Sequence, residues 1–265
     1  MDFHPVEANL RESFRVLAAG RPRGDVLELP GVTIASLGVA FQMFNAAFLN
    51  GPVQGLRELE CRLDLAARHF RSRDLPWALW ICEHWLDRSA RRSLTHACAQ
   101  FGLRLSSEMP GMVAERLTPP KRPLPDLEIR RVDSAAVLDD FRGVGAVCFH
   151  VPLPWFSEVF DGSLPNERRG FVGWVAYHDG QPVATAATLA AHGVIGLYNI
   201  ATAPGQRRRG FAEALTRYAA AAAGCAPDGA VGPIPLVLES TSLGFRLYGR
   251  LGFRTVTGIA VYNSG

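Results

Sequence analysis

The second half of the chain alternates short apolar runs with amphipathic stretches, a pattern typical of an α/β fold. It predicts strands at 127–132, 171–177, 183–190, 193–201, 235–239 and 253–262, and helices at 134–149, 155–160, 211–223 and 242–251. Asp179-Gly180 falls between two of these strands, and Asp-Gly at such a place is a strong hairpin signal. Strands and helices therefore follow one another in a regular order along this half.

The first half shows the same rhythm less clearly. Helical spacing is found at 9–19, 56–70 and 86–101, and apolar strands are predicted within 32–41, at 77–82 and at 112–117. The order of these elements resembles part of the second half, as in a structural repeat.

A proline-rich segment separates the two halves. Four of the seven residues from 119 to 125 are prolines, which cannot continue a helix or a central strand and which favour a stiff, extended connector. A chain of 265 residues is more typical of two domains than of one. We therefore expect one domain over residues 1–118, a linker at 119–126 and a second domain over 127–265.

Composition excludes several classes of protein. Hydrophobic residues make up 48% of the chain and charged residues 20%, so the chain can bury a sizeable core and is not intrinsically disordered. The formal net charge is only +3, which argues against a broad nucleic-acid or membrane-surface footprint. Residues 1–15 carry charges of both signs and no long apolar run. We therefore expect no signal peptide, no membrane anchor and a cytoplasmic location.

The cysteine pattern agrees with a cytoplasmic protein. The chain has five cysteines, an odd number, and no CxxC pair: Cys61, Cys82, Cys98, Cys148 and Cys225. Most of them have apolar neighbours, so small buried thiols in a reducing compartment are expected. No His, Cys and Asp cluster has metal-ligand spacing, and we predict no metal.

A basic, glycine-containing loop follows the predicted strand at 193–201. After a Pro204-Gly205 turn it reads Gln-Arg-Arg-Arg-Gly-Phe-Ala over residues 206–212 and opens an alanine-rich helix. Gly210 allows a close backbone approach or a positive φ, and the first helical turn offers unpaired N–H groups. Flanking arginines can neutralise phosphate charge. The pattern suits a polyphosphate ligand; the alternative is an ordinary strand-to-helix loop with solvated charges.

A second motif lies about 35 residues further on. Residues 247–253 read Leu-Tyr-Gly-Arg-Leu-Gly-Phe, and a predicted strand separates them from the loop, which itself fits R-x-x-G-x-[GA] with Arg207, Gly210 and Ala212. Both motifs in this order resemble the cofactor loop and the closing helix and strand of the GCN5-related N-acetyltransferases (GNAT). The resemblance covers about residues 127–262. It implies a mixed, largely antiparallel central sheet flanked by helices, with the first domain as a degenerate second copy that has lost the ligand loop.

The resemblance also implies acetyl-CoA, or another acyl-CoA, as co-substrate. Backbone N–H groups of the loop would hold the pyrophosphate. Main-chain groups of the preceding strand would pair with the pantetheine arm where this strand diverges from the one at 236–240. The residues so assigned are Ile200, Ala201, Thr202, Arg207, Arg208, Arg209, Gly210, Phe211 and Ala212. The acceptor side is assigned to Asn199, Ser240 and His150.

Acyl transfer to an amine needs a neutral nucleophile, stabilisation of an oxyanion and a proton for the leaving thiolate. By resemblance Tyr248 is the general acid, and a core tyrosine is the alternative. Many relatives carry a glutamate on the strand before the loop, but residues 193–201 contain no carboxylate. Glu239, which follows an apolar strand and can have a raised pKa from partial burial, is the nearest candidate base. A solvent-facing or capping role for Glu239, deprotonation through water, and no base at all are the other possibilities.

Together the motifs predict an N-acyltransferase that moves acetyl from acetyl-CoA to a primary amine of a small molecule or peptide, by direct attack in a ternary complex. A non-catalytic acyl-CoA-binding or regulatory module is the alternative, because the strand carboxylate is missing. A nucleotide-binding protein of another fold would explain the arginines but not residues 247–253. No nucleic-acid or membrane partner is expected.

Overall fold

The computed structural model describes residues 2–19, 21–160, 170–224 and 234–265. Contacts divide the chain into two compact units. Unit 1 contains the chain up to Phe3, Arg11–Gly111 and Thr255–Gly265, and unit 2 contains His4–Leu10 and Met112–Arg254. Each unit therefore draws on both halves of the sequence.

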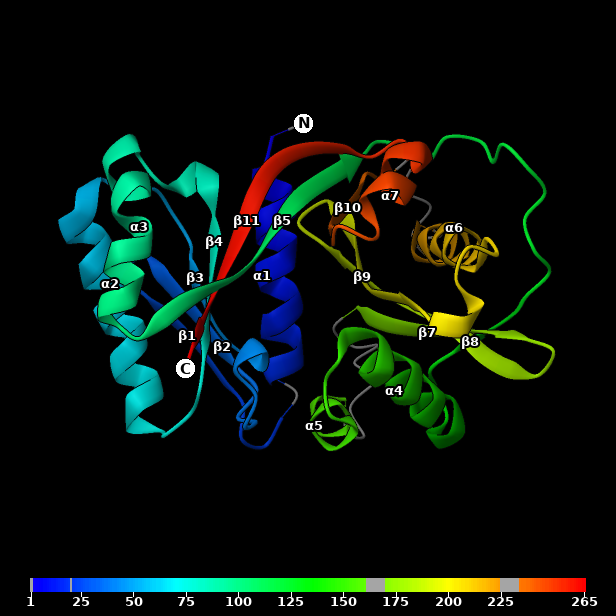
Figure 1. Cartoon of the computed structure of the whole chain (residues 1–265), viewed down its shortest axis with the longest axis horizontal. Coiled ribbons are helices and arrows are strands. Elements are labelled where there is room, and N and C mark those ends of the chain that lie inside the picture. Colours follow the sequence, from blue (N-terminus) through cyan, green and yellow to red (C-terminus); the bar gives the residue numbers. More distant parts are fainter. Residues whose placement is uncertain (1, 20, 161–169, 225–233) are drawn as a thin grey trace. The chain divides into compact units, whose positions relative to one another are not determined.

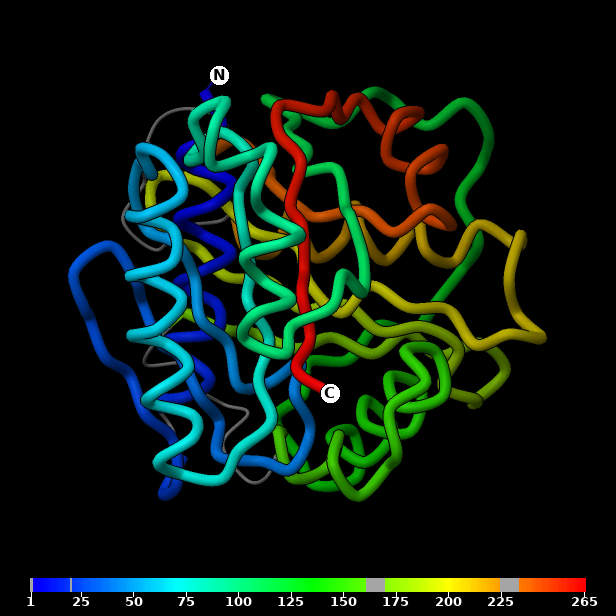
Figure 2. Tube along the Cα trace, turned by 60° about the vertical axis from the view of Figure 1, so that its left-hand side comes forward, coloured from blue at the N-terminus to red at the C-terminus, as the bar shows by residue number. Residues whose placement is uncertain are grey.

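Unit 1 is built on a sheet with the strand order β1-β2-β3-β4-β11-β5. Its elements are α1 (His4–Ala19, from Arg11 on), β1 (Asp25–Leu29), β2 (Val32–Ser36), β3 (Asn45–Leu49), α2 (Gly55–Ser72), β4 (Ala78–Cys82), α3 (Arg88–Gln100), β5 (Leu103–Ala114, up to Gly111) and β11 (Arg254–Ser264, from Thr255 on), with short 3-10 turns at Gln42–Phe44 and Glu83–Trp85. Helices α2 and α3 run side by side along one face (Figure 2). Leu59, Leu63 and Phe70 of α2 pack there with Leu79 and Ile81 of β4 and form the core of the unit.

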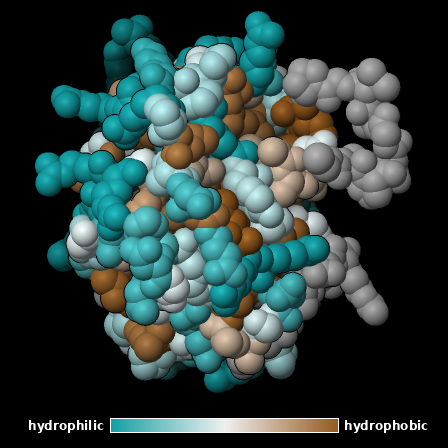
Figure 3. Space-filling view, turned by 90° about the vertical axis from the view of Figure 1, so that its right-hand side faces the viewer, coloured by the Kyte–Doolittle hydropathy of each residue, from teal (hydrophilic) through white to brown (hydrophobic). Residues whose placement is uncertain are grey.

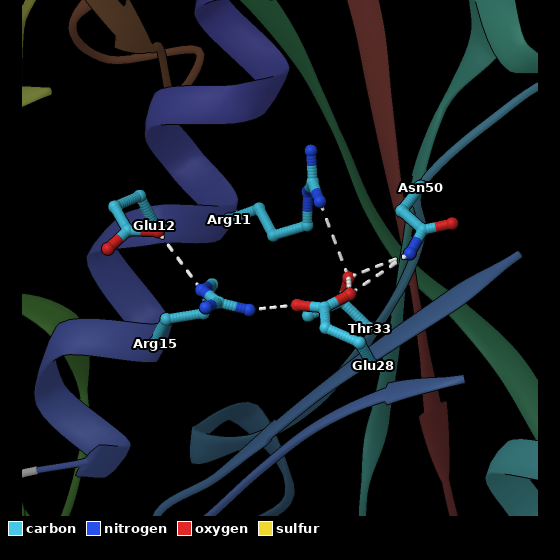
Figure 4. Close-up of polar contacts among 6 residues, drawn as sticks. All are labelled: Arg11, Glu12, Arg15, Glu28, Thr33 and Asn50. Carbon is cyan, nitrogen blue, oxygen red and sulfur yellow. Dashed lines mark hydrogen bonds and ion pairs between the residues drawn. The ribbon is translucent and has the colours of Figure 1, made fainter. Parts of the chain in front are cut away.

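A polar cluster joins α1 to the edge of this sheet (Figure 4). Glu28 on β1 accepts hydrogen bonds from Thr33 (2.7 Å) and Asn50 (3.3 Å), and it pairs with Arg15 of α1. The Thr33 hydroxyl also accepts from Asn50 (2.9 Å) and from Arg11 (3.4 Å). Because Thr33 is fully buried, these bonds satisfy a hydroxyl that would otherwise cost free energy in the interior.

Strands β3 and β4 form a parallel pair connected through α2. Arg62 of α2 holds the segment between β3 and this helix. Its guanidinium donates to the carbonyls of Gly51 (2.8 Å) and Pro52 (2.5 Å), and it pairs with Glu58 one turn earlier in the helix. The Glu58 carboxylate accepts the Gln54 N–H at 2.6 Å. This bond to the backbone is the main reason why the pKa of Glu58 is lowered. The charged side chains of Glu58 and Arg62 thus bond the backbone just before α2.

Unit 2 has the strand order β5-β10-β9-β8-β7-β6, in which only the end of β5, from Met112, takes part. Its further elements are β6 (Glu128–Arg131), α4 (Ala135–Phe149), α5 (Leu153–Val159), β7 (Phe171–His178), β8 (Gln181–Ala191), β9 (Val194–Thr202), a 3-10 turn (Pro204–Gln206), α6 (Phe211–Gly224), β10 (Leu236–Glu239) and α7 (Phe245–Leu251). Helices α4 and α6 cover opposite faces of the sheet (Figure 1). Phe211, Leu215 and Ala219 of α6 pack on Trp174 and Ala186.

The surface of unit 2 mixes polar and apolar side chains. On the face seen in Figure 3, hydrophilic side chains project between small hydrophobic patches. Among the exposed large apolar residues, Leu243 and Phe245 stand at the start of α7, and Leu243 is 81% exposed. The turn after β10 therefore offers apolar surface to a ligand.

The structure confirms the mixed α/β fold with a largely antiparallel sheet flanked by helices. All four helices predicted in the second half are present. The hairpin between β7 and β8 is confirmed, since Asp179 and Gly180 have φ values of 51° and 72°, the positive values that a tight hairpin turn requires.

Several predicted boundaries were wrong. β5 begins at Leu103 and not at residue 112, because its first half is mostly exposed and polar and so lacks a strand signal. α1 begins at His4 and not at residue 9, and α7 begins at Phe245 and not at residue 242. β1 and β3 were not predicted: β1 is a poorly buried strand, and β3 is buried throughout, so neither alternates.

The expectation of buried thiols holds only in part. Cys82 and Cys98 are buried, Cys148 is half-buried, and Cys61 is exposed on α2, contrary to the expectation. All four are free thiols. Cys225 lies outside the described residues.

Replacing Arg62 by alanine should destabilise unit 1, because the carbonyls of Gly51 and Pro52 would lose their donor. We expect the free energy of unfolding to fall by about 1–3 kcal/mol. Arg57→Ala, at an exposed position of the same helix, is the matched control and should change it by less than about 0.5 kcal/mol. Urea denaturation followed by circular dichroism measures both; equal losses would contradict the role assigned to Arg62.

Candidate functional site

Strands β9 and β10 run parallel and part from each other before they end. They pair at Leu236↔Ile195 and Val237↔Gly196. No further pair follows within this fully described stretch, although β9 continues to Thr202. Main-chain groups of β9 on the side of β10 are therefore open to another hydrogen-bonding partner.

A β-bulge at Asn199 redirects β9 at the same level. β8 pairs Ala187 with Tyr198 but Thr185 with Ala201, so β9 places two residues opposite one. Asn199 has a φ of 49°, in the left-handed region that asparagine tolerates better than most residues. The buried Thr185 hydroxyl donates to the Asn199 carbonyl at 2.9 Å. This bond fixes the bulge, which leaves main-chain groups of β9 outside the β8 ladder.

The basic loop after β9 is wound tightly against the start of α6. The 3-10 turn Pro204–Gln206 is followed by Arg208, with a φ of 65°, and Gly210, with a φ of 90°. Only glycine adopts the second value readily, so the conformational reason for Gly210 that the sequence suggested is present. Successive amides around Gly210 can face one anionic ligand at a helix N-terminus.

The three arginines of this loop differ in their contacts. Arg209 is 2.8 Å from the His178 ring nitrogen Nε2 and lies over the Phe211 ring at 4.8 Å. Arg207 donates to the last carbonyl of β9 at 3.3 Å. All three side chains are exposed. Arg209 therefore braces the loop, while Arg207 and Arg208 keep positive charge at its surface.

The proline-rich segment lies against the loop, which sequence reasoning missed. A Cβ built on Gly210 would lie 3.3 Å from Pro125 Cδ and 3.8 Å from Arg122 Nη2. Arg122 thus adds a fourth arginine to the surroundings of Gly210. Its place depends on the course of the connector through space, so no local sequence signal could have found it.

Glu239, at the end of β10, has a buried carboxylate. Its Oε1 atom is shielded from solvent, and within the described part of the chain nothing hydrogen-bonds to it. Burial raises the pKa of Glu239 to about 8, and the Glu7 carboxylate of α1 acts in the same direction. The carboxyl group is therefore mostly protonated at neutral pH and becomes a base as the pH rises through about 8. The apolar run before it indicated such a shift, whereas no signal pointed to Glu7.

Tyr248 and Ser240 lie close together beside this strand end. Tyr248 is 7% exposed, and its ring meets Phe253 edge-on with the centroids 5.8 Å apart. Burial raises the pKa of Tyr248, so its hydroxyl stays protonated at all ordinary pH values. A Cβ built on Gly244 would lie 2.7 Å from Tyr248 Cε2 and 3.3 Å from Ser240 Oγ. Gly244 therefore allows the close approach of the two side chains.

His150 lies at the end of α4 and is exposed. It has a φ of 55°, and its backbone N–H donates to the Ala146 carbonyl, so it serves as the C-cap of the helix. No hydrogen bond found among the described residues joins His150 to Glu239 or Tyr248, and its role in substrate binding stays a prediction.

A cavity of about 250 Å³ lies elsewhere in unit 2. It is lined by α4 residues such as Asp140 and Val147, and by Pro182 and Ala203. Its lining includes neither Glu239 nor Tyr248.

Unit 1 has the same order of elements without an open site. β3, α2 and β4 repeat the sequence of strand, helix and parallel strand seen in β9, α6 and β10. Where unit 2 has the basic loop, unit 1 has the Arg62 guanidinium and the Glu58 carboxylate on the backbone at the start of α2. At this place in unit 1, side chains of the chain itself therefore bond the backbone before the helix.

The described residues show neither a metal-ligand cluster nor a membrane-spanning helix. Over residues 2–19, 21–160, 170–224 and 234–265, no group of three or more His, Cys, Asp or Glu side chains is placed to hold a metal ion. None of the helices in these ranges is long and apolar enough to span a membrane.

The sequence and the structure both resemble known acetyltransferases. Residues 169–255 match the family described as acetyltransferase (GNAT) domain. A GCN5-related N-acetyltransferase from Kribbella flavida superposes with a TM-score of 0.70 at 18% identity, covering 97% of this chain and 95% of that one. A GCN5-related N-acetyltransferase from Sphaerobacter thermophilus gives a TM-score of 0.53 at 15% identity, covering 88% and 76%.

One structural neighbour carries no functional description. It is a functionally unknown conserved protein from Staphylococcus epidermidis, with a TM-score of 0.66 at 12% identity, covering 91% of this chain and 93% of that one. A search of curated protein sequences finds no match.

At these low identities the structural neighbours show the fold, while the family match covers the segment that holds both motifs. That segment contains the bulged strand, the basic loop and α7. The protein therefore has the fold of the GCN5-related N-acetyltransferases over nearly its whole length, and its residues 169–255 match the GNAT acetyltransferase domain family.

Proposed function

We propose that this chain is an acyl-CoA-dependent N-acyltransferase that transfers acetyl from acetyl-CoA to a primary amine by direct attack in a ternary complex. The observation that carries the proposal is the parting of β9 and β10 at a bulge, directly before a loop rich in arginine and glycine. An acyl donor with a nucleotide at one end and an amide-rich arm needs both an anion cradle and an unpaired strand edge. The acceptor is a small molecule or a peptide.

The residues present fit such a co-substrate. In this proposal the amides from Arg207 to Ala212 hold the pyrophosphate, and the exposed arginine side chains of the loop balance its charge. Backbone groups of Ile200, Ala201 and Thr202 pair with the pantetheine arm, and the exposed Leu243 and Phe245 offer apolar contacts. When bound, the thioester supplies an electrophilic carbonyl to the amine.

The proposed chemistry uses one base and one acid. Glu239 takes a proton from the acceptor ammonium, after which the neutral nitrogen forms the C–N bond as the C–S bond breaks. The Tyr248 hydroxyl gives its proton to the leaving thiolate and regains one from the amine nitrogen, and Glu239 releases its proton to solvent. Asn199, Ser240 and His150 are proposed to lie on the acceptor side.

We further infer a tandem arrangement of sequence domains. Residues 127–265 would form the acyl-CoA-binding catalytic domain, 119–126 the linker, and 1–118 a degenerate copy. The matching order of β3-α2-β4 and β9-α6-β10, each with a parallel strand pair, supports this assignment. The internal charges at the start of α2 support the loss of the ligand loop from the first copy.

The second candidate function is a non-catalytic acyl-CoA-binding or regulatory module. It is favoured by the sequence of β9, Val-Ile-Gly-Leu-Tyr-Asn-Ile-Ala-Thr, which carries no carboxylate. Binding of the coenzyme without acyl transfer would identify it.

Thermal denaturation should show that coenzyme A and acetyl-CoA raise the melting temperature more than ATP does, because a ligand stabilises the native state to which it binds.

Gly210→Val should weaken coenzyme A binding at least about tenfold. Its side chain would need a φ of 90° and would meet Pro125. Titration calorimetry measures the loss.

Gly205→Val is the matched control in the same loop, since a Cβ built on Gly205 meets nothing within 4 Å. It should bind coenzyme A like the parent. Circular dichroism verifies that both variants are folded. Preference of the parent for ATP, or full binding by Gly210→Val, would show that the loop is not a coenzyme A site.

Tyr248→Phe and Glu239→Gln should each lower kcat about 100-fold or more, the usual contribution of a general acid or base, while coenzyme A binding is retained. Release of free thiol with spermidine, glucosamine, tyramine and a peptide with a free α-amine as acceptors measures turnover.

For the parent, kcat/KM should rise with pH through about 8, because the Glu239 base is the deprotonated form. Glu239→Gln should lose this limb of the profile.

Tyr218→Phe is the control, because Tyr218 is an exposed tyrosine on α6. It should keep full activity. Undiminished turnover in Tyr248→Phe would remove the acid role, and an unchanged pH profile in Glu239→Gln would remove the base role.

A further inference from the structure

The first turns of α1 belong to unit 2, unlike the rest of the helix. Val6, Glu7 and Asn9 are buried there, and Asn9 has no exposed surface. Sequence reasoning began the helix at residue 9 and gave this segment no function. Residues 4–10, far from the matched family segment, are thus packed into the unit that carries the candidate site.

Asn9 uses both ends of its carboxamide on the hairpin formed by β8 and β9. Its Nδ2 donates to the carbonyls of Ala191 (2.9 Å) and Leu189 (3.3 Å), and its Oδ1 accepts a hydrogen bond of 2.5 Å from the Tyr198 hydroxyl. β9 leaves room for this side chain, because a Cβ built on Gly196 would lie 1.9 Å from Asn9 Oδ1. Asn9 therefore fills space above β9 that any larger residue at position 196 would take.

Tyr198 lies on β9 just before the bulge and beside the point where β9 and β10 part. It is the last residue of β9 to pair with β8 before the bulge. Gly196 and Val237 are paired and so share one face of the sheet. Tyr198 and Glu239 each follow a member of this pair by two residues, so their side chains lie on that same face beyond the point where the strands part. Stacking on Phe171, with ring centroids 6.3 Å apart, holds the Tyr198 ring from another side.

The same helix turn also acts on Glu239. The Glu7 carboxylate raises the pKa of Glu239 beyond the effect of burial, so the two carboxylates are close enough to interact. The start of α1 thus acts on the middle of β9 through a hydrogen bond and on the end of β10 through a charge.

We propose that Asn9 is a positioning residue of the acyl transfer proposed above, on which this inference rests, and that it acts through Tyr198. By accepting a hydrogen bond from the Tyr198 hydroxyl, Asn9 fixes the Tyr198 ring on the face that Tyr198 shares with Glu239, where the acceptor amine is placed. Hydrogen bonds found for Asn9 among the described residues lead to β8 and Tyr198 and not to the basic loop. Its effect therefore falls on turnover and acceptor binding, and not on the affinity for acetyl-CoA.

Two variants test this inference. Asn9→Leu keeps a similar side-chain size and removes all three bonds, whereas Tyr198→Phe removes one hydroxyl and leaves Asn9 bonded to β8. With acetyl-CoA and whichever of the four amine acceptors the parent acetylates fastest, both should lower kcat/KM for the amine between about tenfold and a hundredfold, as a misplaced group does. The Kd for acetyl-CoA, from titration calorimetry, should stay within about twofold of the parent. The double variant should lose no more than Asn9→Leu alone, since both single variants remove the bond between Asn9 and Tyr198.

Val6→Ala separates positioning from stability. Val6 is buried in the same helix turn, so its truncation lowers stability without removing the bond to Tyr198, and kcat/KM should match the parent at a temperature where circular dichroism shows every variant folded. If Asn9→Leu does not fold, Tyr198→Phe carries the test alone.

The inference is wrong if Tyr198→Phe keeps the parent's kcat/KM, if the two losses add, or if Val6→Ala loses as much activity. Fully active variants of an active parent overturn this inference alone. A parent that binds acetyl-CoA but acetylates none of the amines overturns the proposed function, and this inference with it.

Discussion

The candidate site depends on one local constraint, which is that β9 and β10 stop pairing after Gly196 and Val237. A parallel pair normally satisfies the inward N–H and C=O groups of both strands. Here the bulge at Asn199 and the early end of the ladder leave such groups for another partner. Because unpaired backbone groups away from water cost free energy, the gap favours an extended ligand that carries amides. Thr185, whose hydroxyl donates to the Asn199 carbonyl, holds the bulge on which this gap depends.

Unit 1 has a similar order of elements but different polar contacts before its helix α2. At the start of α2 the Glu58 carboxylate accepts a backbone N–H, and the Arg62 guanidinium donates to the nearby carbonyls. Both are interactions that a bound anion and its counter-charge would make. The chain itself therefore supplies a carboxylate to the Gln54 N–H and a guanidinium to the carbonyls of Gly51 and Pro52. These two side chains support the proposal that the first copy has lost the ligand loop.

The parts of the site that could be predicted are those encoded by neighbouring residues. Gly210 and its arginines follow a strand directly, Tyr248 falls within a seven-residue motif, and the apolar run before Glu239 indicated its raised pKa. Asn9 and Arg122 could not be predicted in this way. Their roles arise from contacts with residues far away in the sequence, 189 positions for the bond between Asn9 and Tyr198, and neither stands in a periodic or motif-like setting.

The secondary structure follows the same rule. Amphipathic helices and alternating strands were predicted because each carries its own pattern, whereas the exposed first half of β5 and the fully buried β3 carry none. The order of the strands within a sheet could not be predicted for a different reason. The place of β11 depends on which strand edge is available in the folded chain, and this is a property of the tertiary structure.

That place of β11 has a consequence for how the chain acquires its fold during translation. β4 ends at Cys82, but the strand that lies between β4 and β5 begins only at Arg254. Until the ribosome has added those residues, β4 and β5 present unpaired edges, which are prone to wrong pairing. The region synthesised first therefore cannot complete its sheet before nearly all of unit 2 has emerged, a reversal of the usual order in which domains fold from the N-terminus onward.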